Sequence, residues 1–142
     1  MKKFTSVLML TFVLSALLLS ACAAKPAASE EADKPVPADY SGKTNPFSGK
    51  ADAAEAGKQV YTDNCASCHG DGAKGDGPAG ASLDPKPANL VEALSEDQDD
   101  RIFWTISEGG VPAGKSASMV AWKGTLSEDE IWQTITYLRT LK

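Results

Sequence analysis

The segment Cys65-Ala66-Ser67-Cys68-His69 decides how this 142-residue chain is interpreted, because it brings two of the three Cys together with the only His. Three Cys are too few, and odd in number, for a disulfide scaffold. A single His excludes a zinc site built from several histidines. The chemistry of the chain therefore depends on this short segment and on the few side chains that can act with it.

Four interpretations of the segment compete. A disulfide between Cys65 and Cys68 can form outside the cytoplasm, whereas a thioredoxin-like redox pair requires a βαβ pattern that the sequence lacks. A structural zinc ion requires four ligands, and the folded part of the chain offers three Cys or His side chains. Covalent haem attachment requires two thiols for the vinyl groups and an adjacent His for the iron. The spacing favours this last interpretation, with His69 as the proximal ligand of one haem.

Met119 is the candidate for the second axial ligand, because Met1 and Met9 fall in a predicted export signal. It lies in a Gly- and Pro-containing stretch that is typical of a loop. A lone Met is usually a core residue, but the iron needs a sixth ligand and the sequence has no second His. A thioether ligand raises the reduction potential of the iron. The alternative is a five-coordinate iron with an open face for small gases.

Residues 1–22 are typical of a bacterial lipoprotein signal. Lys2 and Lys3 precede an apolar run of 16 residues, which is shorter than the roughly 20 needed to span a bilayer. Leu19–Cys22 (LSAC) resembles a lipobox, in which the Cys is acylated and becomes the new N-terminus. We expect Cys22 to carry lipid and to hold the chain outside the cytoplasm, in the periplasm or at the outer face of the cell membrane. An uncleaved membrane helix is the alternative.

Residues 23–50 have the composition of a flexible tether. Ala, Pro, Ser, Glu and Lys dominate, four Lys balance four acidic residues, and no helical or strand periodicity is present. As a coil, these 28 residues would span about 30 Å. Tyr40 and Phe47 are the exceptions, and either could dock on the folded part. The predicted domain then covers residues 51–142 and carries a formal charge of −7 from 8 basic and 15 acidic residues.

The predicted domain has an all-helical pattern. Residues 53–64 are rich in Ala, Glu, Lys and Gln and lead directly into the first Cys of the motif. Gly109-Gly110 is expected to end a second helix. Two Ser residues have the spacing of helix N-caps, with Gln or Glu three positions later: Ser95 with Gln98, and Ser127 with Glu130. Apolar residues at helical spacing follow each of them, which predicts two amphipathic helices, and the helix that starts at Ser95 is the one that Gly109-Gly110 is expected to end.

The domain resembles a bacterial monohaem class I cytochrome c over nearly all of residues 51–142. The matching segments, in the order of the family, are YTDNCASCHGDGAKGD (61–76), PKPANL (85–90), IFWTISEG (102–109), MVAW (119–122) and EIWQTITYL (130–138). The resemblance implies an all-α class I cytochrome c fold, in which crossed N- and C-terminal helices enclose one haem. It also implies covalent attachment of haem c at Cys65 and Cys68, and iron ligation by His69 and Met119.

The resemblance further implies where Gly57 and Tyr61 lie. Gly57 is expected at the close approach of the two crossed helices, with Tyr61 packed beside them one turn later. Trp104 and Trp122 are expected as walls of the haem pocket rather than as electron relays, because buried aromatic residues dominate small cores.

Two positions near the axial ligands complete the implied site. The carbonyl of Pro78 or Pro85 is expected to accept the ring N–H of His69, which fixes the tautomer of the ligand. Relatives often carry Pro directly after the axial Met, where this chain has Val120. This departure concerns the rigidity of the loop more than the ligation.

These features predict a carrier of single electrons rather than an enzyme. With both axial positions filled, the iron offers no site for a small-molecule substrate, and the acidic charge argues against binding of nucleic acid. The expected partners are redox complexes of a respiratory or photosynthetic chain, namely a quinol-oxidising complex upstream and a terminal oxidase or reductase downstream. The alternatives are a permanent haem c subunit of a larger membrane oxidoreductase and, after it, a haem-based sensor with an open iron.

Overall fold

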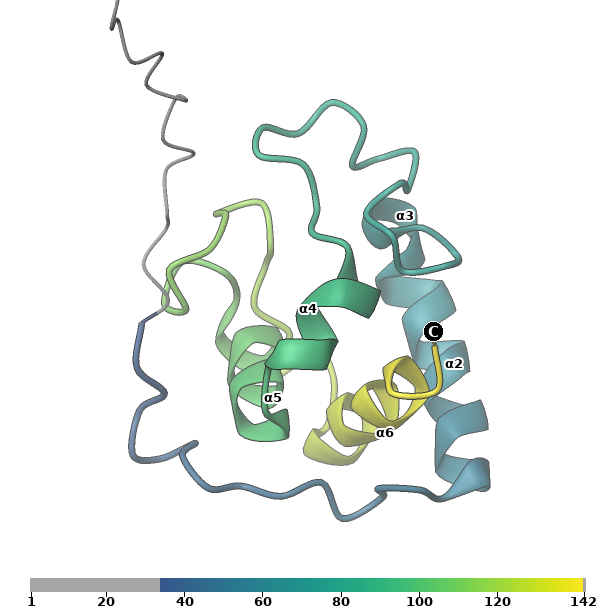
Figure 1. Cartoon of the computed structure of the whole chain (residues 1–142), viewed down its shortest axis with the longest axis vertical. Coiled ribbons are helices and arrows are strands. Elements are labelled where there is room, and N and C mark those ends of the chain that lie inside the picture. The colour runs from purple at the N-terminus through teal and green to yellow at the C-terminus, as the bar shows by residue number, and fades with distance from the viewer. Residues whose placement is uncertain (1–33, 142) are drawn as a thin grey trace, which may run out of the picture. The chain divides into compact units, whose positions relative to one another are not determined.

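Figure 1 shows a computed structural model of the chain, and the structure describes residues 34–141. The predicted lipoprotein signal, its lipidation residue Cys22 and residues 23–33 lie outside this described range. The helices are α2 (Ala51–Asn64), α3 (Ala66–His69), α4 (Leu90–Glu96), α5 (Asp99–Glu108) and α6 (Glu128–Leu138). Residues 34–141 contain no strand, only an isolated bridge between Lys123 and Leu126. The predicted all-α class is confirmed. In the same range, every helix is too short or too polar to cross a membrane.

Helices α2 and α6 cross (Figure 1), and Gly57 lies at the crossing, as predicted. A Cβ atom on Gly57 would overlap the carbonyl of Gln133 and would lie 2.7 Å from the amide nitrogen of Thr134. Only a residue without a side chain lets the two backbones approach this closely. Tyr61, one turn later, is 1% exposed, and its ring centroid lies 5.4 Å from that of Tyr137. Gly57 and Tyr61 thus define the crossing.

The hydrophobic core lies where α5 and α6 meet the α2 crossing. Phe103 of α5 stacks on Trp132 of α6 with ring centroids 4.1 Å apart. Ile131 and Ile135 are 1% and 0% exposed, and burying each such side chain contributes about 1.5–3 kcal/mol. Trp104 is also buried, at 3% exposed, but it does not belong to the group of core residues around Phe103 and Trp132. It therefore packs on another side of α5.

The start of α5 differs from the sequence-based expectation. Ser95 was expected as an N-cap, but it lies inside α4 and donates to the carbonyl of Glu92 at 2.6 Å. The cap of α4 is Asn89, whose side chain accepts from the Val91 amide. Because Asn89 starts a separate short helix, α5 begins only after Gln98, which makes no side-chain cap. The predicted Ser95 cap was wrong.

The other predicted helix ends are confirmed. Ser127 and Glu130 form a capping box at the start of α6, in which the Ser127 hydroxyl accepts from the Glu130 amide. In return, the Glu130 carboxylate accepts from the Ser127 amide at 2.8 Å. Gly109 ends α5 with a φ of +82°, a positive value that Gly adopts at low cost.

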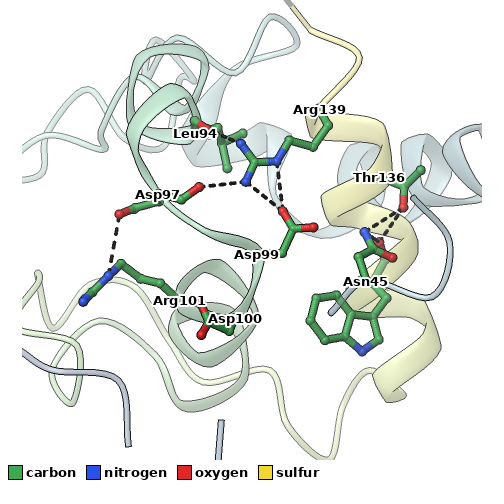
Figure 2. Close-up of polar contacts among 9 residues, drawn as sticks. Asn45, Leu94, Asp97, Asp99, Asp100, Arg101, Thr136 and Arg139 are labelled. Carbon is green, nitrogen blue, oxygen red and sulfur yellow. Dashed lines mark hydrogen bonds and ion pairs between the residues drawn. The ribbon is translucent and has the colours of Figure 1, made fainter. Parts of the chain in front are cut away.

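Arg139, directly after α6, ties that helix to the turn between α4 and α5 (Figure 2). Its guanidinium donates to the carbonyls of Leu94 and Asp97, the latter at 2.7 Å. It also donates through Nε and Nη2 to the Asp99 carboxylate, at 3.0 and 2.7 Å. One side chain therefore satisfies two backbone carbonyls where α4 ends and α5 begins.

Residues 34–50, hereafter the strap, lie against the helices and belong to the same compact unit. Asn45 donates to the carbonyl of Trp132 at 3.2 Å and to the hydroxyl of Thr136 at 3.0 Å (Figure 2). Tyr40 and Phe47, which the sequence marked as possible docking residues, pack against the core. The prediction of a flexible tether therefore does not describe this segment, because two aromatic rings and one amide hold it on the helices.

Candidate haem-binding site

Cys65, Cys68 and His69 share one helical turn at the corner between α2 and α3. The amides of Cys68 and His69 both donate to the Cys65 carbonyl, at 3.2 and 3.0 Å. Side chains three positions apart on such a turn lie on the same face. The two thiols are half-buried and are not joined in a disulfide. The structure thus places two free thiols and an imidazole side by side.

The loop that follows α3, residues 70–89, caps this turn. The carbonyls of Ser67, Cys68 and His69 accept from three loop amides, at distances of 2.9, 3.2 and 2.9 Å. These carbonyls close the helix and have no partner within it. The donating amides are those of Ala79, Gly77 and Gly75, respectively. The loop therefore fixes the backbone of the turn that carries the motif.

The ring of His69 has a carbonyl partner, but not the expected one. Nδ1 of His69 lies 3.4 Å from the carbonyl oxygen of Ala88. A carbonyl can only accept, so Nδ1 carries the proton and Nε2 keeps the lone pair that can bind a metal. The expectation that Pro78 or Pro85 supplies this carbonyl is corrected to Ala88.

Gly75 explains why Ala88 takes this place. Its φ of +77° lies in the left-handed region. A Cβ atom there would overlap the carbonyl oxygen of Pro87 and would lie 3.1 Å from that of Ala88. Through its amide, Gly75 also contacts the backbone of His69. The glycine thus brings residues 87–88 against the turn of the motif. Because these residues are far from His69 in the sequence, no local pattern predicts the contact.

Burial favours the neutral forms of the Cys65 thiol and the His69 imidazole. It raises the pKa of the Cys65 thiol to about 11, with a further contribution from the neighbouring Cys68. Burial lowers the pKa of His69, against the opposing effect of its hydrogen bond to Ala88. At neutral pH the imidazole is therefore uncharged, which is the form that ligates iron.

Met119 lies in the loop of residues 109–123, hereafter the Met119 loop. The carbonyl of Met119 accepts from the Gly110 amide at 2.8 Å, and its side chain is half-buried. The amides of Trp122 and Lys123 donate to the α5 carbonyls of Ile106 and Ser107, both at 3.0 Å. In the view of Figure 1, this loop and α3 lie on opposite sides of α4. The structure thus joins three of the four predicted haem residues and places the fourth on a separate, anchored loop.

The donor set fits haem c better than a bare metal ion. Within residues 34–141, no three His, Cys, Asp or Glu side chains gather as a metal ion would require. Two free thiols on one turn, a neutral imidazole beside them and a half-buried thioether are the groups that a covalently attached haem uses. Trp104 is buried and Trp122 is half-buried, and their expected roles as pocket walls remain predictions.

Comparison with known families identifies the domain. The family model described as cytochrome c matches residues 54–142. The chain belongs to the cytochrome c family. The helical fold agrees with a class I cytochrome c, and a domain of this family carries covalently bound haem c. The crossed helices and the Cys65–His69 motif therefore occur together in this chain, as the resemblance implied.

Among curated proteins, the chain is similar to subunits of cbb3-type cytochrome c oxidases. It is 40% identical over 88 residues to subunit FixPc of Rhizobium leguminosarum bv. viciae, covering 62% of this chain and 28% of that protein. It is 32% identical over 104 residues to subunit CcoP of Azospirillum brasilense, covering 73% of this chain and 34% of that protein. The chain thus spans about a quarter to a third of the length of these relatives.

Sequence reasoning missed Ala88, and of the strap it marked only Tyr40 and Phe47 as possible docking residues. The signal for Ala88 was indirect: the sequence shows that Gly75 lies in a Gly-rich loop, but it does not show that this glycine packs against residues 87–88. The strap had a clearer signal, because Tyr40 and Phe47 are large aromatic residues in an otherwise small and polar segment. Neither could be placed without the three-dimensional contacts.

Proposed function

We propose that this chain transfers single electrons as a haem c subunit of a larger membrane oxidoreductase complex. The observation that carries the electron-transfer role is the turn of Cys65, Cys68 and His69, with free thiols and a neutral imidazole. The similarity to oxidase subunits supports a place in a complex rather than a free shuttle. The chain itself is then an electron carrier and not an enzyme.

Each predicted site residue has a distinct task in this proposal. Cys65 and Cys68 hold one haem through thioether bonds, and His69 binds the iron through Nε2 because Nδ1 is held by Ala88. Met119 provides the second axial ligand, which favours the ferrous state and raises the reduction potential. When bound, the haem supplies the Fe(II)/Fe(III) couple. A fixed ligand shell limits the reorganisation that accompanies each electron.

The setting of this proposal is the extracytoplasmic face of a bacterial membrane. Lipid on Cys22 would hold the chain there. Electrons would come from a quinol-oxidising complex and pass to a terminal oxidase or reductase. A free, lipid-anchored shuttle between such complexes is the second candidate, because Leu19–Cys22 (LSAC) resembles a lipobox that would give the chain a membrane anchor of its own.

Purification from membranes distinguishes the two candidates. The full chain, tagged at its C-terminus, is extracted in mild detergent and its haem-bearing partners are quantified. A subunit copurifies with other redox subunits in a fixed ratio that survives about 0.5 M salt, because a permanent interface is large and apolar. A shuttle is released by the same salt, since transient redox encounters are small and screened.

A further inference from the structure

The strap contacts both ends of the Met119 loop. At the first end, Nζ of Lys34 donates to the carbonyl of Val111 at 3.2 Å, and Arg101 of α5 donates to the carbonyl of Lys34 at 2.9 Å. At the second end, the hydroxyl of Tyr40 donates to the carboxylate of Glu108. That carboxylate also pairs with Lys123 at 2.9 Å. The loop that carries Met119 is therefore held between two strap contacts.

Tyr40 is the centre of the second contact. Its ring lies 6.0 Å from that of Phe103, which fixes its position on the core. Its hydroxyl oxygen accepts from Nζ of Lys123 at 3.4 Å while the hydroxyl donates to Glu108. The hydrogen bonds from Tyr40 and Lys123 lower the pKa of Glu108, so the carboxylate is charged at neutral pH and the bonds to it are charge-assisted.

Apart from the strap contacts, the Met119 loop is anchored on α5 by the amides of Trp122 and Lys123 and is otherwise closed by backbone hydrogen bonds within itself. It contains no helix or strand other than the bridge at Lys123, and Val111 and Val120 are 57% and 56% exposed. The amide of Lys115 donates to the Gly110 carbonyl, which closes the loop on itself. Backbone outside helices and strands opens at a lower free-energy cost than the core does, so the strap contacts at the two ends of the loop add to that cost.

We propose that the strap, through Lys34 and Tyr40, is a positioning device for Met119. By holding both ends of the Met119 loop it keeps the loop closed, and so it sets how firmly the thioether is presented to the iron. Tyr40 acts through Glu108 and Lys123 and is a positioning residue. This inference rests on the proposed function as far as the iron is concerned, whereas the control of the loop itself depends on this chain alone.

The test compares three variants of the full, haem-loaded chain. Tyr40→Phe removes the hydroxyl but keeps the ring on Phe103, and Lys34→Met removes the donor to Val111. Tyr137→Phe is the matched control, because it removes a phenol hydroxyl from a ring that packs on Tyr61, away from the Met119 loop. Melting curves establish that each variant is folded. The readouts are amide hydrogen exchange over residues 109–123 and imidazole binding to the oxidised protein, which competes with Met119.

Tyr40→Phe removes the two hydrogen bonds of the hydroxyl, and Lys34→Met removes one exposed hydrogen bond. Each is expected to speed exchange in residues 109–123 by about three- to tenfold. The apparent affinity for imidazole should rise by about the same factor, since the loop must open first. Tyr137→Phe should change neither. Unchanged exchange in Tyr40→Phe, or an equal change in Tyr137→Phe, overturns the proposal.

The two readouts fail separately. Faster exchange with unchanged imidazole affinity would overturn the link to Met119 while retaining the strap as a brace for the loop. If the chain carries no covalent haem, the proposed function fails, and exchange over residues 109–123 still decides whether the strap holds the loop closed.

Discussion

The carbonyl oxygen of Ala88 lies 3.4 Å from Nδ1 of His69, nineteen positions earlier in the chain. This contact assigns the proton to Nδ1 and leaves Nε2 for the iron. It depends on Gly75, whose backbone touches both His69 and residues 87–88. The orientation of the proposed ligand is therefore set by a loop glycine rather than by the motif alone.

Gly75→Ala should disturb this arrangement. The left-handed φ of +77° and the overlap of a Cβ atom with the Pro87 carbonyl predict a loss of stability of about 2 kcal/mol or more. The displaced Ala88 carbonyl should raise the reduction potential, because an imidazole without its acceptor donates less to ferric iron. Urea unfolding and redox titration measure both. Gly72→Ala is the control, since the nearest atom to its Cβ would be 3.9 Å away. Equal effects of the two variants would contradict the role of Gly75.

Gly57→Ala tests the helix crossing. In an isolated helix, this substitution would stabilise by about 1 kcal/mol. In this fold the added Cβ overlaps the Gln133 carbonyl, so we expect destabilisation by about 3 kcal/mol or more, measured by urea unfolding. Ala56→Gly, on an exposed position of α2, isolates the propensity effect and should cost about 1 kcal/mol. Stabilisation by Gly57→Ala would show that α2 and α6 do not approach at this point.

The capping box of α6 should make stability depend on pH. Hydrogen bonds from the Ser127 amide and hydroxyl lower the pKa of Glu130. A carboxylate whose pKa is lower in the folded state stabilises the fold above its unfolded pKa, and this contribution disappears as the pH falls through the folded value. Glu130→Gln should therefore flatten the stability profile between about pH 6 and about pH 3. Asp129→Asn is the control on the same turn, and an identical profile for both variants would argue against the box.

Arg139 should be more important for stability than its partial exposure suggests. Arg139→Lys keeps the charge but loses the fork that reaches Leu94, Asp97 and Asp99. Because two backbone carbonyls lose a donor, we expect a loss of about 1–2 kcal/mol in urea unfolding. Lys86→Met, on an exposed loop position, should change stability by less than about 0.5 kcal/mol. Full retention of stability in Arg139→Lys would mean that charge alone accounts for the contact.

The parts of the fold that follow local rules could be predicted from the sequence. The haem motif and the α6 capping box each depend on residues a few positions apart. The Gly57 crossing, in contrast, was expected only from the resemblance to class I cytochromes c. The N-cap at Ser95 was wrong because Asn89 competes for the same stretch of chain and starts a separate helix. Local patterns cannot rank two adequate caps when tertiary packing decides between them.

The parts that depend on distant contacts could not be predicted. Asn45 reaches Thr136 across 91 positions, and nothing near Asn45 in the sequence indicates α6. Composition suggested a flexible tether because small and polar residues dominate residues 23–50, yet two aromatic rings and one amide dock residues 34–50. The Ala88 carbonyl was missed for the same reason, because every residue has the same backbone carbonyl whatever its side chain.

The most direct test of the proposed function is the mass of the purified chain. Intact-mass spectrometry under denaturing conditions should show an increase of one haem, because thioether bonds survive unfolding. Cys65→Ala/Cys68→Ala should lack this increase, while Cys22→Ala, which leaves both attachment thiols in place, should show it. A chain with no added haem, or a double variant that retains it covalently, would contradict the assignment of Cys65 and Cys68 as the attachment site.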